Sequence, residues 1–459
     1  MLTYEDLLAV GENDRDRMEF VLKVIREHES SEAYRKAAKA MLYYKGLNPT
    51  ISAYEKIIYD QLGRAHVDMW TANHKIASQF FPFVIDQEVS YLLGNGVRFG
   101  NTATKDKLGE DFDENTQDAT ELARVCGTSF GFWNLDHVDV FSFLEFAPLY
   151  GEETGALMAG VRKWQIDPQK PLRCTLYEPD GYTEYIKKQG EEMEILRPKR
   201  PYKVTVVKTA ADGEIDVNGE NYDGFPIVPL YANKERQSAL TGKQNTVDAL
   251  DLACSNMVNN VDEGNLIYWV LTNCGGMDDL DDAKFLERLK TTHVVHADGD
   301  AGATATAESI EAPFEGTNTT IDMLTKRLYA DFQAFDAAAV SASNQSATAI
   351  KASYIPLDLK CDKIERQVTR WILGILKLAG IDDKPTYQRN QLINKTEETQ
   401  NLIMQAQYLD EEYIREKLLT VNGDIDMLDE INARIDAEAM KRTKPVPNIQ
   451  DEDEEEEAE

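Results

Sequence analysis

The sequence has no long hydrophobic run. None of its apolar stretches approaches the roughly 18 residues that a membrane span needs. The stretch from Trp371 to Ile381 is among the longest, and it contains Lys377. The N-terminus also lacks the basic start and apolar run of a signal peptide. We therefore expect no signal peptide and no membrane partner.

Cysteine and histidine are scarce, with five cysteines and six histidines in 459 residues. The cysteines are widely spaced and form no CxxC pair, which predicts reduced thiols in an intracellular compartment. His293 and His296 lie three residues apart on a predicted strand. Side chains alternate between the two faces of a strand, so we do not expect these histidines to share a metal ion.

The common catalytic motifs are missing as well. There is no Walker A sequence and no G-x-S-x-G elbow, and the glycines from Gly94 to Gly100 fail the dinucleotide-binding spacing. Asp278 to Asp282 could hold a hard cation. Acidic residues at a helix N-terminus more commonly cap free N–H groups and complement the helix dipole. We expect no enzymatic activity, no cofactor and no metal.

Basic residues are in the minority. The chain has 81 acidic and 49 basic residues, a net charge of −32, and eight of the last nine residues are acidic. This charge repels phosphates and excludes a protein that grips nucleic acid tightly. A content of 42% hydrophobic and 9% aromatic residues excludes a wholly disordered chain. The acidic tail from Asp451 is predicted to be disordered.

The hydrophobic patterns that are present predict an α+β fold that is mostly helical. Short antiparallel strands with Asp-Gly and Asn-Gly turns are expected from Ser129 to about Leu230. Pro82 should kink a helix or mark its boundary. The predicted helices are Asp14 to Tyr44, Met69 to Leu93, Asp113 to Cys126, Thr246 to Thr272, Thr320 to Phe335, Ala349 to Leu378 and about Glu397 to Lys441.

Three sequence blocks occur in an order that points to a known family. They are Phe81 to Gly94 followed by Val97 to Phe99, Phe225 to Asn233 with Ser238, and Asn344 to Lys351 followed by Leu357 to Arg366. Each could be an ordinary helix end or turn when taken alone. In this order they resemble the blocks of SPP1-type portal proteins of tailed bacteriophages. Ala347 stands where the family usually has Gly, and so does Ser343.

The resemblance implies a portal fold with wing, stem, clip and crown regions that assembles as a ring around a central channel. It implies a wing over 1–240, a first stem helix over 241–272, a clip over 273–316, a second stem helix over 317–335, a tunnel loop over 336–350, a long wing helix over 351–385, a crown over 386–441 and an acidic disordered tail over 442–459.

The resemblance also implies the function. A ring of usually twelve identical subunits at one capsid vertex would pass double-stranded DNA during packaging and ejection, as weakly contacted cargo. The other implied partners are the terminase large subunit, the major capsid and scaffolding proteins, and head-completion or adaptor proteins. The protein would be made in the host bacterial cytoplasm and reside in the virion.

Site residues follow from the same correspondence. The tunnel loop would present Asp336, Val340, Ser341, Ser343, Asn344, Gln345, Ser346 and Lys351 to the DNA channel. The stem channel wall would include Asp248, Asp251, Asp262 and Glu263. The docking clip would use Asp278, Asp279, Asp281, Asp282, Lys284, Arg288 and Lys290.

Segment charges agree with a channel that does not retain DNA. Gln244 to Thr272 has four acidic residues and no basic one, and Asn273 to Gly316 has ten acidic and three basic residues. Ala337 to Ile350 is uncharged. Because each Lys or Arg that neutralises a phosphate adds affinity and salt dependence, weak and salt-insensitive DNA contact is expected.

Ring closure requires contacts between different faces of adjacent subunits. Leu250, Met257, Val258, Leu324 and Leu328 are candidates for packing within and between subunits. Two other functions stay open from the sequence alone. One is a metal-dependent carboxylate-site enzyme acting on nucleic acid, and the other is a generic helical scaffold or adaptor.

Overall fold

The computed structural model describes residues 2–59, 62–69, 72–209, 215–262, 314–341, 347–389, 395–423 and 425–442. The chain divides into two compact units. The first comprises Met1–Ser343 with Ala352–Asn390, and the second comprises Asn344–Lys351 with Gln391–Glu459. Helices and antiparallel sheets occur together, as the α+β prediction requires.

Four helices begin the first unit: α1 (Tyr4–Val10), α2 (Asp14–Ser30), α3 (Glu32–Tyr44) and α4 (Pro49–Ser52). The single helix predicted from Asp14 to Tyr44 is therefore wrong in one detail. Ser31 breaks it, because its hydroxyl donates to the carbonyl of His28 at 2.6 Å and accepts from the N–H of Tyr34 at 3.1 Å. One residue thus ends α2 and caps α3.

A five-stranded antiparallel sheet contacts the N-terminal helices. Its order is β10 (Met193–Arg200), β9 (Gly181–Lys187), β8 (Leu172–Glu178), β7 (Leu157–Trp164) and β6 (Phe146–Tyr150). Residues Leu7 of α1 and Val21 of α2 are buried in one cluster with sheet residues such as Val161 and Leu176. These helices therefore bury the apolar face of the sheet.

The remaining strands form smaller sheets, so the predicted β-rich block is confirmed. The three-stranded sheet has the order β13 (Ile227–Tyr231), β4 (Thr128–Asn134) and β5 (His137–Ser142). The two-stranded pairs are β11 (Lys203–Thr209) with β12 (Ile215–Glu220), β3 (Val97–Phe99) with β14 (Pro385–Tyr387), and β1 (Ile57–Tyr59) with β2 (Ala65–Val67).

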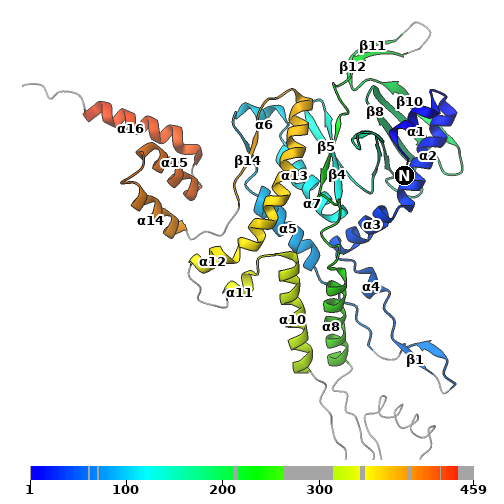
Figure 1. Cartoon of the computed structure of the whole chain (residues 1–459), viewed down its shortest axis with the longest axis horizontal. Helices are drawn as coiled ribbons and strands as arrows, with labels where there is room; N and C mark the ends of the chain where they lie inside the picture. The colour runs from blue at the N-terminus through cyan, green and yellow to red at the C-terminus, as the bar shows by residue number, and fades with distance from the viewer. Residues whose placement is uncertain are drawn as a thin grey trace, which may run out of the picture. The chain divides into compact units, whose positions relative to one another are not determined.

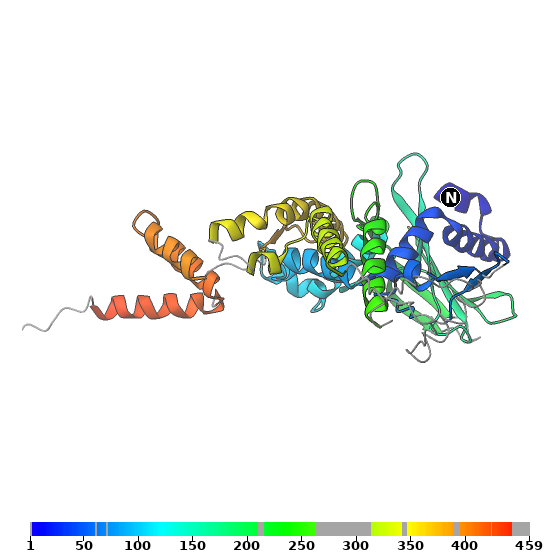
Figure 2. The ribbon, with the colours of Figure 1, turned by 90° about the horizontal axis from the view of Figure 1, so that it is seen from below.

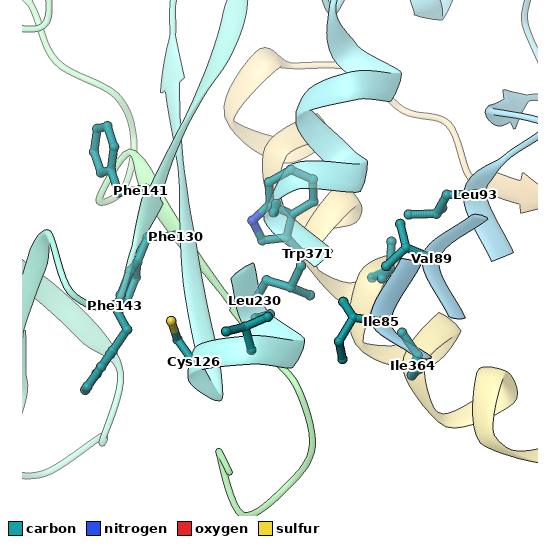
Figure 3. Close-up of a cluster of buried hydrophobic side chains, with 14 of the residues drawn as sticks. Ile85, Val89, Leu93, Cys126, Phe130, Phe141, Phe143, Leu230, Ile364 and Trp371 are labelled. Carbon is teal, nitrogen blue, oxygen red and sulfur yellow. The ribbon is translucent and has the colours of Figure 1, made fainter. Parts of the chain in front are cut away.

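The main core lies between the three-stranded sheet and the helices α5 (Phe80–Leu93), α7 (Phe112–Cys126) and α13 (Ile355–Ala379). Figure 3 shows Trp371 of α13 among side chains of these elements. Its indole N–H donates to the carbonyl of Val228 at 3.1 Å. A Cβ atom on Gly131 would lie 2.4 Å from the Trp371 ring, so glycine permits this close packing.

Two predicted helices are shorter than expected. Residues 72–79 are neither helix nor strand, and α5 begins only at Phe80 with Pro82 in its first turn, which confirms the predicted boundary. The helix expected from Ala349 to Leu378 is divided into α12 (Ala347–Ser353) and α13, because Pro356 starts a new helix after Tyr354. The short helix α6 spans Ala103–Lys107.

Helices α8 (Gln244–Asp262) and α10 (Phe314–Phe332) pack against each other at the lower end of the first unit in Figure 1. Figure 2 shows the same two helices from below. The five-residue helix α11 (Ala337–Ser341) follows α10. Both predicted helices are present over the described residues, but α10 begins at Phe314 and ends at Phe332 instead of running from Thr320 to Phe335.

The second unit contains α14 (Lys395–Gln405), α15 (Glu411–Asn422), the 3-10 helix η1 (Ile425–Met427) and α16 (Leu428–Arg442). The helical region predicted from Glu397 to Lys441 is thus three helices joined by turns. Among the described residues of this unit, Ile414 is the one buried hydrophobic side chain. Within the described residues of both units, no helix combines the length and apolar character of a membrane span.

Candidate functional site

The α8–α10 pair begins and ends in the main core. Leu250 of α8 is 6% exposed and Leu328 of α10 is fully buried, so both residues pack within the subunit. Leu324 is partly buried against the same core. Val258, about two helical turns beyond Leu250 on α8, is 39% exposed. The predicted stem residues near the core, such as Leu250 and Leu328, therefore pack within the subunit. Val258, farther along α8, is exposed on the surface of the single subunit.

A buried ion cluster lies where this pair meets the body; we call Glu88, Arg124, Lys243 and Lys360 the anchor cluster. Glu88 of α5 pairs with Arg124 of α7 at 2.8 Å and also with Lys360 of α13. The Glu88 side chain is 0% exposed, and those of Arg124 and Lys360 are 9% and 11% exposed. Three helices are thus joined through one carboxylate.

The same cluster contacts the ends of both helices of the pair. Lys360 donates to the carbonyl of Phe332, the last residue of α10. Lys243 immediately precedes α8, and its ammonium lies 4.7 Å from the centroid of the Phe332 ring. Cations at a helix C-terminus complement its dipole. The anchor cluster therefore fixes the exit of α10 beside the entry of α8.

Charge in the anchor cluster is unbalanced, with three cations near one carboxylate. Burial alone would raise the pKa of Glu88, but Arg124 and Lys360 outweigh burial and hold that pKa below its ordinary value. Burial lowers the pKa of Lys243 to about 8, with repulsion from Lys360 and Arg124 adding to the effect. The carboxylate is therefore essential to the cluster, whereas the charge of Lys243 is only partly offset by Glu88 and by Asp331 of α10.

A second feature, which we call the polar ladder, runs along α8. Asp251, Ser255 and Asn259 are 1%, 3% and 3% exposed. Their side-chain oxygens accept hydrogen bonds from the backbone N–H groups of Ser78 at 3.1 Å, Ile76 at 3.0 Å and His74 at 2.6 Å. Four residues of helix rise about 6 Å and two extended residues about 6.6 Å, so the two spacings match.

The polar ladder changes the interpretation of the predicted wall residues. Asp251 also accepts from the side chain of Asn48 at 2.8 Å, so its carboxylate faces the subunit interior and the expectation that it lines an open wall is wrong. Asp248 is half-buried and accepts from Tyr43 at 2.5 Å. Asp262 is exposed and pairs with His74 at 2.9 Å. Glu263 lies outside the described residues.

Two stacked aromatic side chains lie at the two ends of the predicted tunnel-loop region that follows α10. Phe335 and Tyr354 stack with ring centroids 3.9 Å apart, so the chain on either side of residues 336–353 meets at one point. The side chain of Gln87 holds this point by donating to the Phe335 carbonyl at 2.9 Å and accepting from its N–H at 2.8 Å. The base of the loop is therefore fixed to α5.

Individual tunnel-loop residues are only partly placed. Asp336 accepts from the N–H groups of Ala338 and Ala339 at 3.1 Å each, which starts the short helix α11. Val340 is half-buried, Ser341 ends α11, and Lys351 of α12 is exposed. The other predicted loop residues, Ser343, Asn344, Gln345 and Ser346, lie outside the described residues.

Of the predicted clip, only residues 314–316 are described, as the start of α10. All of its named docking residues lie outside the described part of the chain: Asp278, Asp279, Asp281, Asp282, Lys284, Arg288 and Lys290. His293 and His296 fall there too. Within the part that the structure describes, no group of three or more His, Cys, Asp or Glu side chains is placed to hold a metal ion. The described cysteines, Cys126, Cys174, Cys254 and Cys361, are free thiols.

Sequence reasoning missed Glu88, Asn48 and Gln87, but a signal exists for Glu88. The buried stripe of α5 includes Phe81, Val84, Ile85 and Leu92, and Glu88 falls on this stripe. A carboxylate at an apolar helical position predicts a buried cationic partner. The i, i+4 spacing of Asp251, Ser255 and Asn259 is a comparable signal for a buried polar face.

Comparison with known proteins gives matches over most of the chain. Residues 23–441 match the family model described as "Phage portal protein, SPP1 Gp6-like". A portal protein of Clostridium phage phiCD119 is 24% identical over 356 residues, which cover 71% of this chain and 77% of that protein. The portal protein of Bacillus phage SPP1 is 22% identical over 418 residues, covering 83% of this chain and 79% of that protein.

Proposed function

The chain belongs to the SPP1 Gp6-like family of phage portal proteins, and on this premise we propose that its subunits form a ring whose central channel passes double-stranded DNA. The family match over residues 23–441 carries the proposal. It favours a portal over a carboxylate-metal enzyme or a generic scaffold. A portal is a virion component, and we assign this protein a structural rather than an enzymatic role.

The α8–α10 pair is the proposed stem of each subunit. The anchor cluster supports this assignment because it fixes both helices at their junction with the body. The wing comprises the rest of the first unit up to α8, with α13 as its long helix. The second unit, with α14 to α16, is the proposed crown. The proposed clip, where the terminase and later the head-completion proteins dock, is the predicted range 273–316 without its last three residues, which belong to α10.

Ring assembly is the first prediction, and electron microscopy of the purified full-length protein tests it. We expect closed rings of about twelve subunits with a central hole, because family members assemble with cyclic symmetry through heterologous contacts. Monomers or compact particles without a hole would contradict the proposal. Divalent-metal-dependent nuclease turnover that is lost in the Asp281→Ala variant would favour the enzyme instead.

Weak contact with DNA is the second prediction. The proposed stem wall retains Asp248, Asp262 and Glu263. Between the predicted loop residues Asp336 and Lys351, the stretch from Ala337 to Ile350 has no charged residue. A wall that neutralises no phosphates releases no counterions, so affinity should stay weak and nearly independent of salt. We expect a dissociation constant weaker than about 10 μM for a 30-base-pair duplex between 50 and 200 mM salt.

Fluorescence anisotropy with assembled rings measures this affinity. As a positive control for a basic wall, the Asp262→Lys variant places one added cation per subunit on an exposed stem position. It should tighten binding and introduce a salt dependence. Tight binding of duplex by the unmodified ring at physiological salt would contradict the proposed channel electrostatics.

A further inference from the structure

Residues 53–79 leave the body after α4, form the β1–β2 hairpin and return along α8; we call this segment the arm. Eight exposed large hydrophobic side chains of the described residues fall within the arm. They are Tyr54, Ile57, Ile58, Tyr59, Leu62, Val67, Met69 and Ile76. Exposed apolar patches of this kind mark interaction surfaces.

The pairing register makes one face of the hairpin wholly apolar. Ile57 pairs with Val67 and Tyr59 with Ala65, and directly opposed residues of an antiparallel pair share a face. This apolar face is open to solvent in the single subunit, with Ile57 55%, Tyr59 72% and Val67 47% exposed. The opposite face presents Ile58 and its partner His66. A two-stranded hairpin is marginal in water alone, so this face requires a cover.

The arm is held firmly in place at its root. Ser78, Ile76 and His74 donate their backbone N–H groups to the polar ladder of α8. Lys75 donates to the carbonyl of Ser52 and Lys56 to that of Ala72, each at 2.6 Å, which joins the two ends of the arm. The base of the hairpin is therefore fixed to α8, and Figure 1 shows β1 projecting away from α8 on the side of α4.

The charge of the arm, compared with that of the whole chain, indicates which kind of partner surface the arm contacts. Copies of a chain with a net charge of −32 repel one another, so their contact surfaces must be locally low in charge. The arm has three acidic and three basic residues and is therefore neutral, unlike the chain as a whole. On the stem, Val258 and Val261 lie three residues apart on α8 and are 39% and 61% exposed. Residues at this spacing share one helical face.

We propose that the apolar face of the arm docks onto the exposed α8 face of the adjacent subunit in the ring. This inference rests on the proposed ring assembly. Each subunit then gives its hairpin to one neighbour and receives the hairpin of the other on Val258 and Val261. Such a contact joins different faces of adjacent subunits, which is the heterologous geometry that closes a ring.

Two neighbouring isoleucines give a matched pair of variants. Ile57→Asp places a charge on the apolar face, whereas Ile58→Asp makes the same change one residue later on the opposite face. We expect Ile57→Asp to lower the ring fraction at least about tenfold and Ile58→Asp to leave it within about twofold. Native mass spectrometry and sedimentation measure ring fraction, and circular dichroism melting verifies that each subunit is folded.

A photocrosslink identifies the surface that receives the arm. Benzoylphenylalanine replaces Tyr59, and rings are assembled from equal amounts of nitrogen-14 and nitrogen-15 subunits. We expect mixed-isotope crosslinks between position 59 and peptides of α8 in another copy. Rings that form normally with Ile57→Asp, or crosslinks confined to one copy, to other regions or to a different protein, overturn the arm contact while the ring itself stands. Absence of rings in the unmodified protein instead overturns the proposed function.

Discussion

Replacing Glu88 with glutamine is expected to destabilise the subunit by about 3–5 kcal/mol, since it leaves buried cations without their counter-ion. The Glu88 carboxylate is fully buried and pairs with both Arg124 and Lys360. A neutral amide keeps the volume and removes the charge. Lys243 lies in the same cluster, so mutual repulsion among three cations would no longer be offset.

The matched control is Lys243→Met, which removes a cation rather than the anion. Because the pKa of Lys243 is lowered by burial and by neighbouring cations, its charged form is unfavourable in the folded state. We expect the methionine variant to be as stable as the unmodified protein or more so. Urea unfolding of both variants measures the difference. If the two variants lost equal amounts of unfolding free energy, the excess of cations in the anchor cluster would not be the cause of the destabilisation.

Glu88 and Lys243 should each make the stability of the subunit depend on pH, in two separate pH ranges. The folded-state pKa of Glu88 is below its ordinary 4.5, so its contribution is present at neutral pH and is lost as the pH falls below that value. Lys243 releases its proton at about pH 8 when folded and near 10.5 when unfolded, so stability should rise with pH across this window. Lys243→Met should reduce that rise, with the remainder coming from Lys360, whose pKa is also lowered by burial. Glu88→Gln should flatten the acid limb.

The order of the sequence blocks was enough to predict the family and the helix–insert–helix arrangement around α8 and α10. Each block lies where neighbouring residues in the sequence decide the local backbone structure, such as the segment before α8 or the start of α13. The helix predicted from Met69 failed over residues 72–79 for a tertiary reason. Three of their backbone N–H groups, those of His74, Ile76 and Ser78, bond to side chains of α8 more than 170 residues later in the chain.

Asp251 was misassigned for the same reason. A carboxylate on a predicted stem helix is expected to face solvent, because burying an unpaired charge is costly. The acceptors of the polar ladder instead face backbone donors from the arm and the side-chain amide of Asn48. No local pattern around Asp251 encodes these partners. Only the four-residue spacing of Asp251, Ser255 and Asn259 indicates that this face of α8 is buried.

Asp251→Leu is therefore expected to cost about 2–4 kcal/mol and to loosen the arm from α8. The variant leaves the part-buried N–H of Ser78 without its acceptor, and an unsatisfied buried donor costs about 1–3 kcal/mol. It also removes one of the two acceptors of Asn48, which keeps Asp248 at 3.0 Å. Hydrogen exchange should rise first at Ser78 and then at Ile76 and His74.

The Asp251→Asn variant distinguishes the contribution of the hydrogen bond to stability from that of the carboxylate charge. Burial raises the pKa of Asp251 above its ordinary 3.8, so the charged form is disfavoured and its contribution to stability falls as the pH rises through that raised value. An amide oxygen still accepts from Ser78, and the loss should be only about 1 kcal/mol with a flatter pH profile. Asp262→Asn, on the exposed end of α8, should change neither stability nor exchange measurably. Equal protection of Ser78 in the leucine and asparagine variants would mean that the polar ladder does not hold the arm.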